Sequence, residues 1–277
     1  MDVLETVAAA RAALAKAKRP LGLVPTMGYL HQGHLSLVRL ARKADRTVFA
    51  SIFVNPTQFG PSEDYAVYPR DMKRDLGMLG DEGVDFVFAP SADEMYPSGY
   101  KTYVTVERIT EQLEGSFRPT HFRGVATIVL KLLTILQPDH AYFGQKDAQQ
   151  LRVIRQLATD LNLPVEIVAG PTVREPDGLA LSSRNVLLSA EERTAATALS
   201  RALRAAEERY RGGERSGTRL REAMRAELAS EPLLQPDYVS VANADTLEEL
   251  DTIDGPALLS LAARAGKTRL IDNIPLP

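Results

Sequence analysis

Short apolar runs alternate with stretches of helical periodicity along the N-terminal part of the chain. The apolar runs, each typical of a strand buried on both faces of a sheet, are residues 21–25, 47–53, 84–88, 140–143 and 165–168. Between them, apolar side chains recur at the spacing of one helix face, in residues 35–41, 69–79, 123–136 and 151–161. This alternation predicts an α/β fold with a doubly wound, Rossmann-like parallel sheet and right-handed crossovers.

Two further segments carry a pattern of their own. Val3, Val7, Ala10 and Leu14 repeat at helical spacing, which predicts an N-terminal helix ending in basic residues. Residues 100–106 alternate in polarity and break the strand–helix rhythm, which predicts a strand at an edge of the sheet. In a homodimer, such an edge could pair with its copy in a second chain.

The pattern changes after residue 169. Residues 169–185 hold two prolines and no clear periodicity, which places a domain boundary near residue 175. Ser189 and Glu192 then form a capping-box pattern at the start of a helix. Two helical stretches and three strand-like runs follow, within residues 190–211, 220–228, 238–241, 257–261 and 268–271. The sequence therefore predicts two domains, residues 1–175 with the parallel sheet and residues 176–277 with a smaller α+β arrangement.

Composition narrows the class of protein. The chain has 277 residues, 44% of them hydrophobic and 25% charged, as in globular proteins with an ample core. A net charge of −3 gives no positive field, so neither nucleic acid nor a membrane is an expected partner. The absence of cysteine excludes disulfides, thiolate catalysis and Cys-based metal sites. The sequence indicates no leader peptide or membrane span, and we expect a soluble cytoplasmic protein.

One stretch, residues 24–37 (VPTMGYLHQGHLSL), has an unusual composition for a strand-to-helix turn. Gly28 permits a tight turn, and Gly33 leaves room for a flat ring or a phosphate against the backbone. His31 and His34 would aim two nitrogen donors in one direction, beside helix N–H groups that attract anions. Most His-x-x-His pairs are surface or helix-capping residues, but this pair directly follows a strand. The context favours a nucleotide triphosphate site without a P-loop.

Polar residues also follow other predicted strands, at the sheet edge that lines the ligand crevice in open α/β folds. They occur in residues 55–58, 143–150, 173 and 181–185. Lys146 supplies a movable positive charge for phosphate, and the Gln150 amide suits a small hydroxy acid. In residues 182–185 (SSRN), two hydroxyls and a guanidinium could clamp phosphates as the domains close, although such tetrapeptides are usually turns and helix caps.

Several assignments stay open or are rejected. Asp147 could cap a helix or contact the nucleotide, and the basic group Arg118, His121 and Arg123 could be a solvated helix entry or bind a ligand. His140 lies in a strand-like run and is expected to be structural. Residues 265–268 (AGKT) resemble the end of a Walker A motif but lack its first glycine and its context. The Gly-x-Gly-x-x-Gly pattern of dinucleotide sites does not follow the first strand.

The order of motifs resembles that of a known family. PTMGYLHQGH (25–34), NPTQF (55–59), HFRGV (121–125), FGQKDAQQ (143–150) and LSSRN (181–185) occur in the order found in pantoate–β-alanine ligases, and TRLIDN (268–273) follows them. The first motif is similar to the HIGH-type signature of the nucleotidylyltransferase and class I synthetase superfamily. The resemblance implies ATP- and Mg²⁺-dependent condensation of pantoate with β-alanine through an enzyme-bound pantoyl adenylate, which releases pyrophosphate and AMP.

The resemblance also implies roles for individual residues. Those that would contact ATP are Met27, Gly28, Tyr29, Leu30, His31, Gln32, Gly33, His34, Gly144, Gln145, Lys146, Asp147, Val173, Leu181, Ser182, Ser183 and Arg184. Gln58 and Gln150 would hold pantoate, and Gln58 would also lie by β-alanine. His34 would be the catalytic proton donor, acting with His31, Lys146 and Arg184. Leu181 and Gln145 depart from the common Met and Glu of the family.

The chemistry of the first step agrees with these residue types. A carboxylate is ionised at pH 7, so its attack on the α-phosphate needs no general base. The step needs in-line positioning and neutralisation of charge on the phosphates. The sequence holds no Asp cluster that would build a protein metal site, and we expect Mg²⁺ on phosphate oxygens and water. Residues 175–185 are the candidate lid that protects the adenylate from hydrolysis.

Three alternatives are compatible with the same signature. A nucleotidylyltransferase would make a dinucleotide-like product, and a nucleotide-sensing module would bind ATP without reaction. A histidine–metal hydrolase would need carboxylate ligands that the sequence does not place near the histidines. Pantoate-dependent ATP–pyrophosphate exchange in the absence of any amine separates the ligase from the first two.

Replacing His34 by alanine should slow adenylation roughly 100-fold or more, because it removes a donor to the transition state. The rate of pantoate-dependent ATP–pyrophosphate exchange measures the effect. Exchange near the wild-type rate would remove His34 from the mechanism.

Overall fold

The computed structural model describes residues 1–61 and 63–277 of the chain. Its larger sheet is parallel throughout and has the strand order β1-β4-β3-β2-β5-β6. The bounds of these strands are β1 (Asp2–Leu4), β2 (Leu21–Thr26), β3 (Thr47–Ile52), β4 (Phe86–Phe88), β5 (His140–Gly144) and β6 (Glu166–Gly170). The expected doubly wound α/β domain is thereby confirmed, and its apolar runs form the strands because helices cover both faces.

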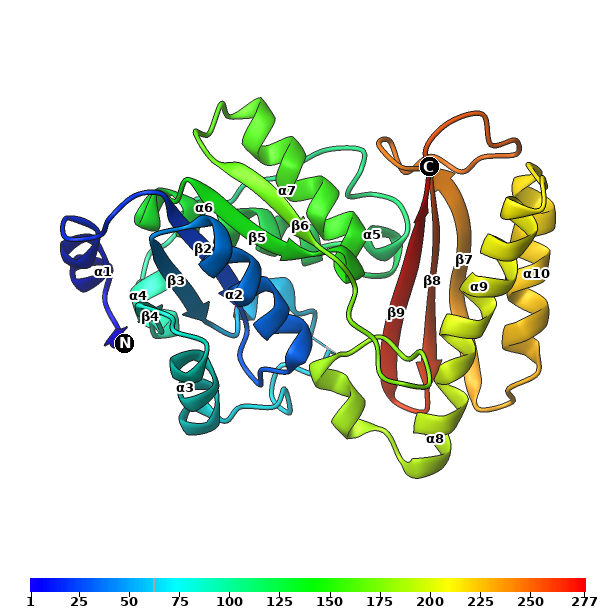
Figure 1. Ribbon diagram of the computed structural model, residues 1–277, viewed down its shortest axis with the longest axis horizontal. Helices are drawn as coiled ribbons and strands as arrows, with labels where there is room; N and C mark the ends of the chain where they lie inside the picture. Colours follow the sequence, from blue (N-terminus) through cyan, green and yellow to red (C-terminus); the bar gives the residue numbers. More distant parts are fainter. Residues whose placement is uncertain (62) are drawn as a thin grey trace.

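Helices pack on both faces of this sheet (Figure 1). On one face lie α1 (Val7–Leu14), α6 (His121–Leu136) and α7 (Ala148–Asp160), which share one apolar core with the strands. On the other face lie α2 (Gln32–Ala44) and α3 (Met72–Asp81), over a second core. The short helices α4 (Ala92–Met95), α5 (Glu114–Phe117), η1 (Pro56–Gln58) and η2 (Gln145–Asp147) connect these elements. Helix α6 is buried over most of its length, as its nearly continuous apolar sequence predicts.

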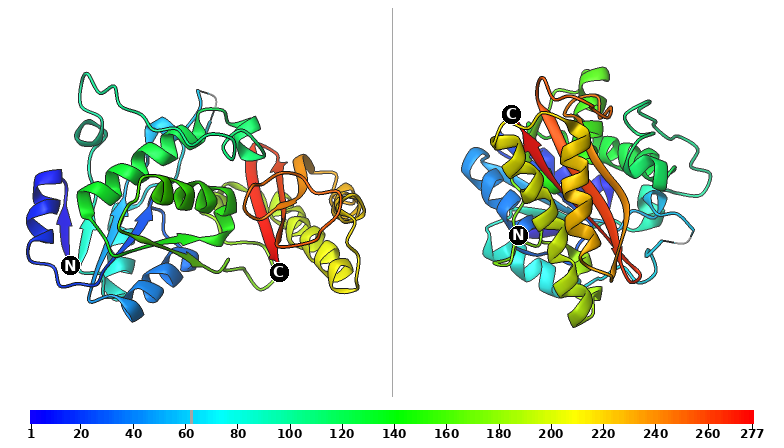
Figure 2. Two further views of the ribbon diagram at one scale, coloured as in Figure 1. Left: turned by 90° about the horizontal axis from the view of Figure 1, so that it is seen from above. Right: turned by 90° about the vertical axis from the view of Figure 1, so that its right-hand side faces the viewer.

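A smaller α+β domain follows at the C-terminal end of the chain, as predicted. Its antiparallel sheet has the order β7-β8-β9, and two long helices cover one face (Figure 2). The elements are η3 (Ser183–Leu187), α8 (Ala190–Ala195), α9 (Thr197–Arg211), α10 (Gly217–Ala229), β7 (Leu234–Asn243), β8 (Ala257–Ala265) and β9 (Thr268–Leu276). The capping box of Ser189 and Glu192 is present at the start of α8.

Two sequence predictions are wrong. Val3 lies in β1, which pairs with β4, and the helix begins only at Val7 after its N-cap Thr6. Residues 100–106, all of which the structure describes, form no strand. Their aromatic rings lie against basic side chains of α6 instead: the Lys131 Nζ atom is 4.7 Å from the Tyr100 ring centroid and the Arg123 guanidinium is 4.0 Å from that of Tyr103. Val104 and Val106, which alternate with polar residues, pack on the apolar core that α6 shares with the sheet.

Helices in the described part of the chain are too short or too polar to cross a bilayer. His140 is structural, as expected, because its Nδ1 atom lies 2.6 Å from Asp45 Oδ1. The hydroxyl of Tyr142 donates to the other oxygen of the same carboxylate at 2.6 Å. These contacts tie β5 to Asp45, the residue that caps the C-terminal end of α2.

Candidate active site

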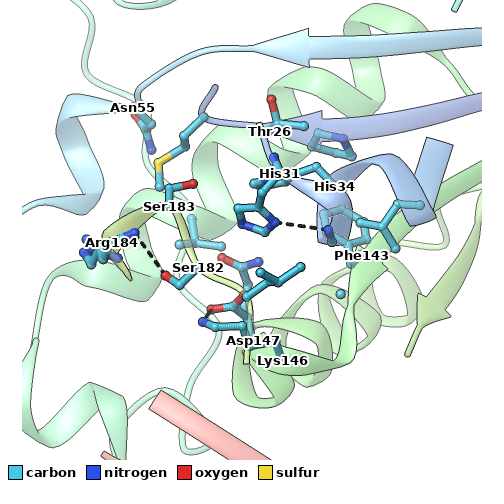
Figure 3. A pocket seen from close by; sticks show the side chains of 18 of the residues that line it. Thr26, His31, His34, Asn55, Phe143, Lys146, Asp147, Ser182, Ser183 and Arg184 are labelled. Carbon is cyan, nitrogen blue, oxygen red and sulfur yellow. Dashed lines mark hydrogen bonds and ion pairs between the residues drawn. The ribbon is translucent and has the colours of Figure 1, made fainter. Parts of the chain in front are cut away.

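A cavity lies at the carboxyl edge of the parallel sheet, where β2 and β5 are neighbours although β3 and β4 lie between them in the chain. Such a reversal of strand order leaves a crevice in which open α/β sheets bind ligands. The loops after β2, β3, β5 and β6 contribute residues to the cavity, and so does the apolar face of α6. Figure 3 shows His31, Lys146 and Arg184 among the side chains that line it. The fold therefore gathers motifs that are more than a hundred residues apart in the sequence.

A strained turn joins β2 to α2. Gly28 and Tyr29 have φ angles of 82° and 49°, in the left-handed region that a tyrosine rarely adopts. The buried carboxylate of Asp75, on α3, accepts hydrogen bonds from the backbone N–H groups of Tyr29 (2.7 Å) and Leu30 (2.8 Å). The Thr26 hydroxyl accepts from the N–H of Gly28 at 3.1 Å. These bonds offset the strain and fix where the helix begins.

The two histidines cap the helix that follows. The Nδ1 atom of His31 accepts from the Gly33 N–H at 3.1 Å, and the Nδ1 atom of His34 accepts from the His31 N–H at 3.3 Å. In this capping box, His31 takes the position that Ser or Thr usually occupies, and His34 takes that of Glu or Gln. Because each Nδ1 is an acceptor, each neutral ring carries its proton on Nε2. The arrangement therefore provides two Nε2–H donors, one on each ring, and the centroids of the two rings are 4.1 Å apart.

The surroundings keep both rings neutral. Burial, then the charge of Lys146, lowers the pKa of His31 from 6.5 to about 4. Burial, the neighbouring His31 and Lys146 lower the pKa of His34 well below its usual value. At pH 7 in the absence of a ligand, both rings are therefore hydrogen-bond donors without a net charge.

Two glycines serve different purposes at this site. A Cβ atom on Gly33 would lie 2.9 Å from two atoms of the His31 ring, so the flat ring that presses on this backbone belongs to the protein itself. A Cβ atom on Gly144 would meet nothing within 4 Å. Gly144 thus leaves open space at the end of β5, where a ligand can approach the backbone.

A second group of polar residues lines the same cavity: Lys146, Asp147, Ser182, Ser183 and Arg184. The Ser183 hydroxyl donates to the Tyr29 carbonyl at 3.1 Å, which joins this segment directly to the strained turn. Asp147 precedes α7 but its side chain makes no capping hydrogen bond. Its carboxylate lies in the cavity near the Lys146 ammonium, at 3.9 Å.

Arg184 already has a counter-ion. Its guanidinium binds the carboxylate of Asp64 through two hydrogen bonds, of 2.7 and 2.9 Å, and lies over the Tyr68 ring at 5.6 Å. This bidentate pairing raises the pKa of Arg184 further despite its burial. Arg184 is therefore oriented before any ligand binds, and a ligand anion would compete with Asp64 for it.

Gln58 is held in place from two sides. Its side chain accepts from Asn55 Nδ2 at 3.0 Å and donates to the sulfur of Met27 at 3.2 Å. Its backbone carbonyl accepts from His121 Nδ1 at 2.9 Å. A Cβ atom on Gly124 would lie 2.4 Å from the Thr57 carbonyl oxygen, so only glycine allows α6 to pack this closely on η1.

The opposite wall of the cavity is apolar. It consists of Val125, Ile128, Val129 and Leu132 of α6, with Phe53 and Phe143 beside them. Gln150, on the first turn of α7, also lines the cavity. The cavity thus joins a polar end rich in N–H and cationic groups to an apolar end with amide side chains.

Comparisons with known proteins agree with this geometry. A sequence model described as "Pantoate-beta-alanine ligase" matches residues 2–275. The chain is 61% identical over 276 residues to a pantothenate synthetase of Roseiflexus sp. (strain RS-1), covering 100% of this chain and 99% of the relative. It is 64% identical over 275 residues to that of Chloroflexus aurantiacus, covering 99% and 97%. The chain belongs to the pantoate–β-alanine ligase family.

Solved structures of this family share the fold. The pantothenate synthetase of Thermus thermophilus superposes with a TM-score of 0.96 at 49% identity, over 99% of each chain. A pantoate–β-alanine ligase from Francisella tularensis, described as a complex with β-γ ATP and β-alanine, superposes with a TM-score of 0.82 at 33% identity. That match covers 99% of this chain and 97% of the Francisella chain.

The structure brings most of the predicted site residues of this family to one cavity. These are Met27, His31, Gly33, His34, Gln58, Gly144, Lys146, Asp147, Gln150, Val173, Leu181, Ser182, Ser183 and Arg184. Five others do not line it. Gly28 and Tyr29 form the strained turn, Leu30 is buried in the core, and the Gln32 side chain accepts from Arg39. Gln145 donates to Asn273 of β9 at 3.2 Å.

Sequence reasoning missed several residues that shape the site. Asp75 and Asp64 look like ordinary surface acids in the sequence, and only the fold brings them to the turn and to Arg184. Tyr68 also lines the cavity. The apolar wall was visible in the sequence as a buried helix, but the pattern did not indicate that part of its face meets a cavity.

The buried histidines should make the protein less stable in weak acid. Burial lowers the pKa of His31 to about 4 and that of His121 to about 3, so below pH 6.5 the unfolded chain takes up protons that the folded chain does not. The free energy of unfolding should therefore fall as pH decreases from about 6.5 towards 4. Replacing His121 by asparagine, whose amide can still donate to Gln58, should make this slope shallower by about 1.4 kcal/mol per pH unit. Urea titrations between pH 4.5 and 6.5 measure both slopes, and equal slopes would contradict the account.

Proposed function

We propose that this chain condenses (R)-pantoate with β-alanine at the expense of ATP, giving pantothenate, AMP and pyrophosphate in coenzyme A precursor biosynthesis. The observation that carries the proposal is the reciprocal capping of His31 and His34, which leaves two Nε2–H donors beside Lys146 and Arg184 in one cavity. Membership of the pantoate–β-alanine ligase family supports the same reaction. The Francisella relative, described with an ATP compound and β-alanine, supports both substrates.

In the first step, a carboxylate oxygen of pantoate attacks the α-phosphorus of ATP. The bond from that phosphorus to the bridging oxygen breaks, and pyrophosphate leaves with the electron pair. Charge grows on the leaving group, where the imidazole N–H groups and the Lys146 ammonium can stabilise it. Bound phosphates would raise the pKa of both histidines. The resemblance to the family implies that His34 is the proton donor.

The other end of the cavity suits pantoate. Its hydroxyl and carboxylate groups can bind the amides of Gln58 and Gln150, and its two methyl groups can lie against the apolar wall of α6. Gln58 cannot turn away easily, because Asn55 and Met27 hold its side chain. The resemblance to the family also implies a role for Gln58 beside β-alanine, whose amine would attack the adenylate carbonyl in the second step and displace AMP.

Residues 175–185 would close over the adenylate, moving with a domain that comprises residues 176–277. Arg184 would then exchange its Asp64 partner for phosphate oxygens. Mg²⁺ would enter bound to ATP and neutralise phosphate charge; the carboxylate of Asp147, which lies in the cavity, is an oxygen ligand of the kind that Mg²⁺ accepts. We further propose that the protein is cytoplasmic and forms a homodimer.

The partial reaction tests the proposal most simply. The protein should exchange labelled pyrophosphate into ATP when pantoate and Mg²⁺ are present and no amine is added. Adding β-alanine should then release AMP and pantothenate in equal amounts. Exchange that does not depend on pantoate, or ATP binding without exchange, would contradict the proposed activity.

Asp64→Asn should tighten ATP binding several-fold. The variant removes the carboxylate that competes with phosphate for Arg184, and loss of a charged hydrogen-bond partner is worth about 1.5–3 kcal/mol before compensation by water. Calorimetric titration with β,γ-imido-ATP measures the change. Asp245→Asn is the matched control, because Asp245 is an exposed acid in a 3.4 Å ion pair with Arg152 outside the cavity. Weaker binding in Asp64→Asn would show that Asp64 assists the nucleotide instead of competing with it.

A further inference from the structure

Strand β9 of the C-terminal domain carries two adjacent polar residues that are almost completely buried. Asp272 is 3% exposed and Asn273 is 4% exposed. Buried polar groups on a strand normally serve a nearby hydrogen-bond network. Here each side chain forms hydrogen bonds outside its own sheet: Asp272 with Arg174, and Asn273 with the loop that contains Lys146.

The Asn273 side chain binds the segment that contains Lys146. Its amide nitrogen donates to the carbonyl oxygens of Gln145 (3.0 Å) and Lys146 (2.7 Å). Its amide oxygen accepts from the side chain of Gln145 at 3.2 Å. Both protons of the Asn273 amide are used, and its two carbonyl partners are consecutive in the chain. No other residue type has two donors and one acceptor in so short a side chain.

These contacts hold the two peptide groups that flank the Cα atom of Lys146, one through the Gln145 carbonyl and one through the Lys146 carbonyl. A lysine has a long, flexible side chain, so the place of its ammonium group depends on where its backbone is anchored. Lys146 lies at the end of β5 in the short helix η2, and its side chain lines the cavity. The anchor comes from a residue 127 positions further along the chain.

We propose that Asn273 is a positioning residue: by holding the backbone at Lys146, it places the Lys146 ammonium group where it can bind the phosphates of ATP. The inference rests on the proposed function, because it takes the ligand of Lys146 to be a triphosphate. Asp272 has a separate part, since its carboxylate binds Arg174 through hydrogen bonds of 2.6 and 2.9 Å. The C-terminal domain thus holds the lysine loop through Asn273 and the segment that leads to Ser182–Arg184 through Asp272.

A double-mutant cycle tests the proposal. Asn273→Leu keeps the side-chain volume but removes all three hydrogen bonds, and Lys146→Met removes the charge. Each single variant should weaken the binding of β,γ-imido-ATP about tenfold or more, since charged hydrogen bonds contribute energies of that order. If Asn273 acts through Lys146, the double variant should bind within about threefold of Lys146→Met alone, because coupled residues are not additive. The same cycle in ATP–pyrophosphate exchange should show the same non-additivity.

Ser260→Ala is the matched control. Ser260 lies opposite Asn273 in the register of β8 and β9, and its buried hydroxyl has no hydrogen-bond partner among the described residues. This variant should bind the analogue like the wild type. Thermal unfolding followed by circular dichroism checks that each variant is folded. If Asn273→Leu gives no cooperative transition, Asn273→Ser replaces it in the cycle.

The outcomes separate this inference from the proposed function. Effects of Asn273 and Lys146 that multiply in the double variant would overturn the inference, as would a folded Asn273 variant that binds the analogue like the wild type. A wild-type chain that binds no analogue would overturn it as well. If the wild-type chain binds the analogue but shows no pantoate-dependent exchange, only the proposed function is overturned. The double-mutant cycle measures binding affinity and does not require the reaction to occur.

Discussion

The site depends on how the chain passes from β2 into α2. The turn must adopt left-handed backbone angles at Gly28 and Tyr29, and it must start the helix so that His31 is its N-cap. Asp75 makes this possible by accepting two backbone N–H groups of the turn. Once the start of the helix is fixed, the capping bonds of His31 and His34 settle the proton positions of both imidazoles. A ligand therefore meets donors whose orientation costs nothing further at the time of reaction.

The remaining groups are placed by contacts between distant parts of the chain. Arg184 is oriented by Asp64, Gln58 by Asn55 and His121, and the Lys146 loop by Asn273. Each of these contacts joins segments that could otherwise move independently, apart from the local bond within residues 55–58. The cavity is thus lined by residues from distant parts of the chain, and each of its two cations lies near a carboxylate, Lys146 near Asp147 and Arg184 near Asp64.

The sequence predicted the parallel sheet and the identity of most cavity residues because both depend on local patterns. Strands buried on two faces read as apolar runs, and the motifs lie directly after those strands. It failed where an alternating pattern had another cause: Val104 and Val106 pack on the apolar core that includes α6, and residues 100–106 form no strand. It also could not tell which way a loop side chain points. Gln32 and Leu30 lie within the motif, yet one is exposed and the other is in the core, because helix phase and the Asp75 bonds decide their directions.

The most direct measurement is a crystal structure of the protein with β,γ-imido-ATP and Mg²⁺. The account predicts that the triphosphate lies across the start of α2, within hydrogen-bond distance of the Nε2 atoms of His31 and His34. It also predicts contacts to Lys146 and to Arg184 released from Asp64. A nucleotide bound elsewhere, with residues 27–34 packed away from it, would contradict the account.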